Sequence, residues 1–281
     1  MSDLHSINEA INKKAGRKLL PSIAVGLSLL TLVWFSLSFQ REIFAIVVAV
    51  AVILGVRELV RAFSARGIVI SFNGLTLAAI GLSYAAWVGG VAGLAVATAI
   101  AFPLLLIRAL LQGPEGFVAK ATATTFGLLY LPFLAGFLIL LARPSTGFQR
   151  VMTFVVLVGC NDTFGYIVGV LLGKHPLVPK ISPKKTWEGL AGSLIFTMIG
   201  GALAFEYIMD MHWWIGIIVG LMIVFTATCG DLIESAMKRD LSLKDMGTLL
   251  PGHGGMLDRL DSVVLSSPAM WLALELVKHF L

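Results

Sequence analysis

Apolar stretches of about twenty residues recur along almost the whole of this 281-residue chain. A helix of roughly 20 residues crosses the hydrocarbon core of a bilayer, which is about 30 Å thick. Charged residues make up only 13% of the sequence, whereas soluble domains average about 25%. Lipid offers no partner for an unpaired backbone group, and the ten-residue alternation of a membrane barrel is absent, so the stretches must be helices. The sequence predicts an all-α, polytopic integral membrane protein.

The hydropathy pattern predicts about nine transmembrane helices. They span residues 19–39, 43–60, 68–88, 91–111, 122–142, 151–172, 190–209, 213–230 and 262–280. The second and third are candidates for a tilted or broken helix, because Arg57 and Glu58 close the second and the third contains Asn73 and several glycines. We expect the first span to be retained rather than cleaved, since its apolar stretch is too long for a signal peptide.

The distribution of basic residues predicts the orientation. With nine spans and a cytoplasmic N-terminus, 17 of the 21 basic residues fall on the cytoplasmic side, as the positive-inside tendency requires. These are Lys13, Lys14, Arg17, Lys18, Arg57, Arg61, Arg66, Arg108, Lys120, Lys174, Lys180, Lys184, Lys185, Lys238, Arg239, Lys244 and Arg259. Only Arg41, Arg143, Arg150 and Lys278 remain on the other side. We therefore expect a multi-pass protein of the inner (cytoplasmic) membrane.

Three parts differ in character. Residues 1–18 are polar, with apolar residues at helical spacing, which suits either a short helix lying on the membrane surface or a frayed tail. Residues 19–150 are nearly all apolar and form a predicted N-terminal transmembrane bundle. Residues 151–281 add polar clusters at helix ends and form the predicted catalytic half. The net charge of +5 favours anionic lipids or phosphorylated substrates as partners, and no soluble basic domain is present to bind nucleic acid.

The first polar cluster surrounds Asp162, inside an apolar span. A carboxylate there is costly to bury and is a functional candidate by default. The alternative is a packing residue satisfied by a neighbouring hydroxyl.

The second cluster runs from Gly173 to Gly189 and contains Ile181-Ser182-Pro183-Lys184-Lys185-Thr186-Trp187-Glu188-Gly189. Prolines shape an extended turn, and a helix beginning near Thr186 would add backbone N–H donors to the lysine side chains, which suits phosphate. The alternative is ordinary topology, which needs the lysines but not this order of residues.

The third cluster begins at Asp231 and Glu234 and runs through 235–261, the most densely charged stretch of the chain. Asp231 and Glu234 are three residues apart on one helix face, and Asp258 and Asp261 repeat this spacing. Carboxylates together with substrate phosphates are the usual ligands of Mg²⁺. His253, between glycines, either contacts a phosphate or fills a turn.

The 27 residues from Ser235 to Asp261 resemble the motif of the phosphatidate cytidylyltransferases, also called CDP-diacylglycerol synthases. The matching elements are Lys238-Arg239, Lys244-Asp245, Pro251-Gly252-His253-Gly254-Gly255 and Asp258-Arg259-Leu260-Asp261. The block Ile181 to Gly189 is similar to a second motif of this family. One departure is Val170, which stands where the family often has Arg or Lys.

The resemblance implies Mg²⁺-dependent transfer of a cytidylyl group from CTP to phosphatidate, giving CDP-diacylglycerol and pyrophosphate, with a second cation as an option and a homodimer as the assembly. It implies Asp231 and Asp258 as metal ligands, with Asp162, Asp245 and Asp261 as further candidates. The residues expected to act at the reacting phosphates are Asp231, Asp258, Lys238, Arg239, Lys244, Asp245 and Arg259. Those expected to bind substrate are Ser182, Lys184, Lys185, Thr186, Glu188, His253, Gly254 and Gly255.

Two alternatives stay open from the sequence. An ion-coupled transporter would use Asp162 and Asp231 to bind its coupling ion near the middle of the membrane, although most acids of this chain lie at predicted helix ends. A cytidylyltransferase acting on a different lipid phosphate would keep the chemistry and change only the acceptor.

Overall fold

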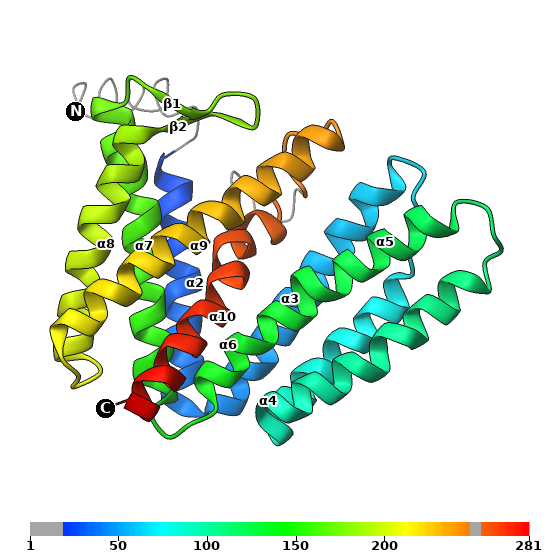
Figure 1. The fold of residues 1–281 in the computed structure, drawn as a ribbon, viewed down its shortest axis with the longest axis horizontal. Coiled ribbons are helices and arrows are strands. Elements are labelled where there is room, and N and C mark those ends of the chain that lie inside the picture. Colours follow the sequence, from blue (N-terminus) through cyan, green and yellow to red (C-terminus); the bar gives the residue numbers. More distant parts are fainter. Residues whose placement is uncertain (1–18, 248–253, 281) are drawn as a thin grey trace.

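The computed structural model describes residues 19–247 and 254–280, which are almost entirely helical. The elements are α2 (Leu19–Phe39), α3 (Arg41–Ser64), α4 (Phe72–Leu110), α5 (Phe117–Leu128), the π-helical turn η1 (Leu129–Phe133), α6 (Leu134–Ala142), α7 (Gly147–Leu172), β1 (Pro176–Val178), β2 (Ser182–Thr186), α8 (Trp187–Tyr207), α9 (Trp213–Asp240) and α10 (Leu257–Phe280) (Figure 1). Seven helices in the described part of the chain are long and apolar enough to cross a membrane. The predicted all-α, polytopic fold is confirmed.

Helix α4 turns back on itself at Gly90, between the predicted spans 68–88 and 91–111. Gly90 has φ 63° and ψ −147°, a conformation that glycine adopts without the strain a Cβ atom would cause. A Cβ atom added to Gly74 would lie 2.8 Å from Leu105 Cδ2, so residues 31 positions apart are in contact and the two arms are antiparallel. Arg143 closes the bend by donating from Nε to the carbonyl oxygen of Trp87 (2.7 Å).

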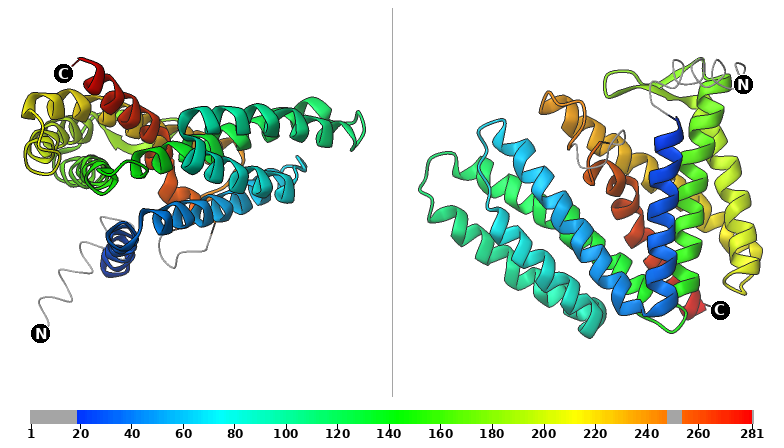
Figure 2. Two further views of the ribbon diagram at one scale, coloured as in Figure 1. Left: turned by 90° about the horizontal axis from the view of Figure 1, so that it is seen from below. Right: turned by 180° about the vertical axis from the view of Figure 1, so that it is seen from behind.

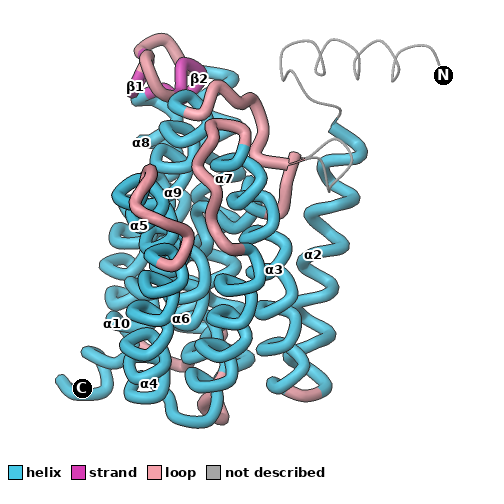
Figure 3. The backbone as a smooth tube through the Cα atoms, turned by 90° about the vertical axis from the view of Figure 1, so that its right-hand side faces the viewer, coloured by secondary structure: helices cyan, strands magenta, loops and turns pink. Residues whose placement is uncertain are grey.

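Successive helical segments run in opposite directions, so alternate connections lie at the same end of the bundle (Figure 1). One end carries the β1–β2 hairpin, the connections 65–71 and 111–116, and the segment after α9 (Figure 3). The predicted cytoplasmic basic residues from Arg57 onward lie in these connections or in the adjoining helix ends. The side of the membrane that this end faces stays a prediction, and the predicted surface helix at residues 1–18 lies outside the described residues.

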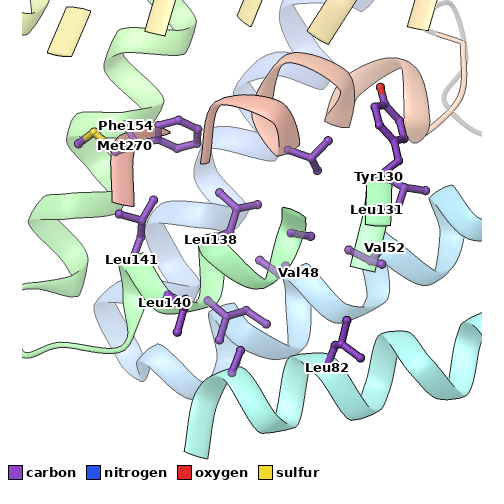
Figure 4. Packing of buried hydrophobic residues seen from close by; sticks show 14 of the residues in the cluster. Val48, Val52, Leu82, Tyr130, Leu131, Leu138, Leu140, Leu141, Phe154 and Met270 are labelled. Carbon is purple, nitrogen blue, oxygen red and sulfur yellow. The ribbon is translucent and has the colours of Figure 1, made fainter. Parts of the chain in front are cut away.

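The buried apolar core joins the early and late helices. Leu59, Leu82, Leu131, Leu141 and Phe154 are fully buried in one cluster (Figure 4). Helix α10 packs against α6, and α2 packs at the periphery against α3 and α7 (Figure 2). The last helix is therefore anchored on the first half of the chain.

Two helices extend beyond the predicted spans. We expected 213–230 and 262–280, but α9 continues to Asp240 and α10 begins at Leu257. Hydropathy marks only the part of a helix that suits lipid, whereas the backbone hydrogen bonds continue through the charged residues beyond it. Asp231, Glu234, Asp258 and Asp261 consequently lie on helices, whereas Asp245 lies in the segment after α9.

Candidate active site

The site forms where α9 and α10 cross. A Cβ atom added to Gly230 would lie 2.5 Å from the backbone carbonyl oxygen of Asp261, so only a glycine at this position allows the two helices to approach so closely. Asp231 follows Gly230 directly on α9, and Asp261 lies on α10 at the crossing. The close contact therefore brings acids from the two helices together.

Three carboxylates converge at the crossing. Asp231, Glu234 and Asp261 each offer an oxygen, and these oxygens lie within 4.8 Å of one another. Glu234 and Asp261 are buried, with 1% and 7% exposure. The Oε1 atom of Glu234 has no hydrogen-bond partner among the described residues. Buried polar atoms nearly always have a bonding partner. A cation bound between the three acids would supply the partner that this oxygen lacks. The acids fit an oxygen-loving divalent ion.

Two lysines lie against the acids. The Nζ atom of Lys238 is 2.5 Å from Glu234 Oε2 and 2.8 Å from Asp258 Oδ1, so one ammonium group joins α9 to α10. Lys185, from β2, is 2.5 Å from Asp231 Oδ2. The hairpin is thereby held against the crossing of the helices.

Asp258 occupies a different position from the three clustered acids. Its Oδ1 accepts from Lys238, and its Oδ2 accepts from the backbone N–H groups of Met246 (3.1 Å) and Gly255 (2.7 Å). Its carboxylate thus ties the charged segment after α9 to the first turn of α10. Its expected role as a metal ligand beside Asp231 stays a prediction.

Two other predicted metal ligands, Asp162 and Asp245, are not among the three clustered carboxylates. Asp162 lies in α7, is exposed, accepts a hydrogen bond from Asn161 Nδ2 (2.9 Å), and interacts electrostatically with Asp231 and Lys185. Asp245 is exposed and is not one of the three clustered carboxylates. The structure thus gathers Asp231 and Asp261 and adds Glu234, whose spacing was noticed in the sequence but which was not predicted as a ligand.

The second cluster forms the hairpin and the start of α8. Thr186 is the N-cap of α8, as expected, and its Oγ1 accepts from the backbone N–H of Gly189 (3.1 Å). Glu188 accepts from the backbone N–H groups of Lys174 and His175 and lies 2.6 Å from His175 Nδ1. Glu188 therefore closes the base of the hairpin.

The remaining predicted substrate residues lie near this end. Ser182 is half-buried in β2, and Lys184, Arg239 and Lys244 are exposed. The Nε of Arg239 donates to the carbonyl oxygen of Ile181 (3.2 Å), which links α9 to the hairpin. Arg259 lies within electrostatic range of Asp162. Gly254 has φ 82° and precedes Gly255, whereas His253 lies outside the described residues.

Sequence reasoning missed the part that Glu58 of α3 plays. This side chain is 6% exposed and accepts from the backbone N–H groups of Met256 (3.0 Å) and Leu257 (2.8 Å). These N–H groups at the start of α10 have no partner within the helix. A Cβ atom added to Gly247 or Gly255 would lie 2.3 Å from a carboxylate oxygen of Glu58. Glu58 therefore holds the start of α10, one turn from the acids.

Comparison with known proteins shows the family of the chain. The model of the cytidylyltransferase family matches residues 21–277. The chain belongs to this family. It is 38% identical over 280 residues to the phosphatidate cytidylyltransferase of Mycobacterium leprae, covering 94% of this chain and 90% of the relative. The Mycobacterium bovis enzyme of the same name is 36% identical over 277 residues, with the same coverage. The Staphylococcus aureus enzyme of that name is 40% identical over 137 residues, which cover 48% of this chain and 52% of the relative.

Proposed function

We propose that this protein transfers a cytidylyl group from CTP to phosphatidate, giving CDP-diacylglycerol and pyrophosphate. The observation that carries the proposal is the convergence of Asp231, Glu234 and Asp261 with Lys185 and Lys238 at one end of a transmembrane bundle. Such an end can meet a soluble nucleotide and a bilayer lipid together. Relatives that match nearly the whole chain are phosphatidate cytidylyltransferases, which supports this substrate pair.

The chemistry requires charge compensation and alignment. An oxygen of the lipid phosphate forms a bond to the α-phosphorus of CTP, the bond from that phosphorus to the bridging oxygen breaks, and pyrophosphate leaves with the electron pair. Both reactants are anions and repel each other, so the site must supply positive charge and orientation. The lipid phosphate is already ionised at neutral pH, and no general base is needed.

The exposed cations are placed to bind the phosphates. Lys184, Arg239 and Lys244 extend from β2, from the end of α9 and from the segment after it. Lysine provides a point charge, and arginine can form two parallel hydrogen bonds to one phosphate. Lys185 and Lys238, held against carboxylates, keep the acids in position. These side chains orient the triphosphate and stabilise the leaving pyrophosphate.

Asp231, Glu234 and Asp261 would hold the magnesium ion, and Asp258, Asp162 and Asp245 stay predicted metal ligands. A bound divalent ion supplies neutralisation of the triphosphate and a template that orients the reacting oxygens. Carboxylate oxygens are the protein ligands that Mg²⁺ prefers.

We further propose that the site faces the cytoplasm, in the inner membrane, and that two chains form a homodimer. The basic residues at the same end support the orientation, because cytoplasmic connections carry an excess of lysine and arginine. CTP would enter from the cytosol, and phosphatidate would enter sideways from the bilayer. Protease accessibility of the β1–β2 hairpin in sealed vesicles and the mass of the purified protein in detergent test these two statements.

The decisive experiment measures pyrophosphate release by the purified protein in detergent. We expect release only when CTP, phosphatidate and Mg²⁺ are all present, with CDP-diacylglycerol identified by its mass. Asp231→Asn should lose turnover, whereas Asp210→Asn, the same change in the α8–α9 connection at the opposite end, should keep it. Turnover with another lipid phosphate alone would reassign the acceptor. If the protein turns over no lipid phosphate but takes up a solute after reconstitution in sealed vesicles, the proposal is overturned in favour of a transporter.

A further inference from the structure

Tyr130 is a polar residue in an otherwise apolar part of the first half of the chain. It lies in the π-helical turn η1, which contains Pro132, and its side chain is 5% exposed. Its hydroxyl is buried and has no hydrogen-bond partner among the described residues. A buried hydroxyl without a partner is costly, so such a group calls for an explanation.

The tyrosine ring is fixed by its neighbours. It stacks on Phe126 with ring centroids 4.9 Å apart and an interplanar angle of 14°, and Phe126 in turn meets Phe63 edge to face. Proline cannot donate the backbone hydrogen bond of a regular helix, and single π-helical turns occur frequently at functional sites. Because the ring is stacked on Phe126, the position of its hydroxyl oxygen is fixed.

The hydroxyl is directed toward the acids of the α9–α10 crossing. It lies within electrostatic range of Asp261, Glu234 and Asp231. Figure 4 shows Tyr130 extending from η1 toward the α10 ribbon, away from the packed aliphatic side chains. Glu234 Oε1 is a second buried atom without a hydrogen-bond partner among the described residues. One of the three carboxylates and the hydroxyl near them thus each lack a partner among the described residues.

We propose that Tyr130 is a positioning residue of a divalent-cation site formed by Asp231, Glu234 and Asp261. Its hydroxyl donates a hydrogen bond to the oxygen atoms that surround the ion, either a ligating carboxylate or a water held by the ion. This inference rests on the ion of the proposed function and extends it by assigning a residue of the first half to the cation site. A phenol is suited to the role because it donates a hydrogen bond while its ring stays in apolar packing.

Mn²⁺ serves as the probe, because it shares the preference of Mg²⁺ for oxygen ligands and its binding is followed by electron paramagnetic resonance. The purified wild type, Tyr130→Phe and the matched control Tyr84→Phe are titrated in detergent without nucleotide or lipid. Tyr84 lies on α4 and is 69% exposed. Loss of an outer-shell partner costs about tenfold or more in metal affinity. We expect at least this weakening for Tyr130→Phe and none for Tyr84→Phe.

Thermal unfolding separates this role from simple packing. Phenylalanine preserves the stacking on Phe126 and removes only an unsatisfied hydroxyl, so Tyr130→Phe in chelator should melt at or above the temperature of the wild type. The stabilisation that added Mn²⁺ gives should be smaller in Tyr130→Phe. Equal Mn²⁺ affinity of the wild type and Tyr130→Phe would overturn this inference alone. A wild type that binds no Mn²⁺ would overturn it together with the proposed ion. Cytidylyl transfer, assayed separately, decides the reaction itself.

Discussion

Replacing Glu58 by glutamine tests how the first half of the chain supports the site. Each carboxylate oxygen of Glu58 accepts one backbone N–H, from Met256 and from Leu257. Glutamine keeps the shape and one acceptor oxygen, but its NH₂ group faces an N–H donor. One hydrogen bond is lost and one buried donor at the start of α10 is left without a partner.

The expected cost follows from these contacts. Leaving a buried donor unsatisfied costs about 1–3 kcal/mol, and removing a helix N-cap costs about 0.5–2 kcal/mol. These ranges describe the same loss and are not added, so we expect about 2 kcal/mol for Glu58→Gln. At roughly 2–4 °C per kcal/mol for a chain of this size, the Tm should fall by several degrees. Glu58→Ala removes both acceptors and should cost about twice as much.

The assay combines thermal unfolding in detergent with pyrophosphate release. Glu42→Gln is the matched control, because Glu42 lies on the same helix and is exposed. We expect Glu58→Gln to lose turnover as well as stability, since Asp258 lies in the turn of α10 that Glu58 holds. If Glu58→Gln has the Tm and the turnover of the wild type, the assignment of Glu58 as the cap of α10 is refuted.

Two further predictions concern charged pairs. Asp258→Asn should abolish pyrophosphate release while the protein still reaches the membrane fraction in normal amount, and near-normal turnover would remove Asp258 from the mechanism. Lys238→Met leaves the nearly buried Glu234 and Asp258 without their ammonium partner. Breaking such a buried pair costs about 3–5 kcal/mol, so the Tm of this variant should fall. Lys278→Met, which breaks an exposed pair at the other end of the bundle, should change the Tm little, and equal shifts for the two lysine variants would contradict the argument.

Much of the fold could be predicted from hydropathy. In lipid the backbone groups must bond to one another, which favours helices, and the thickness of the bilayer sets the minimum length of a spanning helix. The break between 88 and 91 was predicted and falls at Gly90. Hydropathy did not give the end of α9 or the start of α10, because a helix that extends beyond the apolar span continues on its own backbone hydrogen bonds. The hairpin register, Pro176 with Thr186 and Val178 with Ser182, depends on pairing that hydropathy does not encode.

The candidate site was predicted in part. The family resemblance implied Asp231 and Asp258 as metal ligands and Asp261 as a further candidate, but it did not give the position at which α9 and α10 cross. That position is set by contact between Gly230 and the backbone of Asp261, which is a property of two helices and not of either alone. Glu234 was visible as the partner of Asp231 at helical spacing. Only the crossing shows that Glu234 faces Asp261.

Glu58 and Tyr130 were harder to find, because neither belongs to one of the three polar clusters. Each is a polar group within a helix that can span the membrane, where an unsatisfied polar group costs more than in a soluble protein. For Glu58, the backbone N–H groups at the start of α10 donate hydrogen bonds to both carboxylate oxygens. By the same reasoning, the hydroxyl of Tyr130, which has no partner among the described residues, requires one, and the acids near it indicate where that partner binds. A buried polar residue in an apolar span therefore indicates a contact with a distant part of the chain, which for Glu58 is the start of α10.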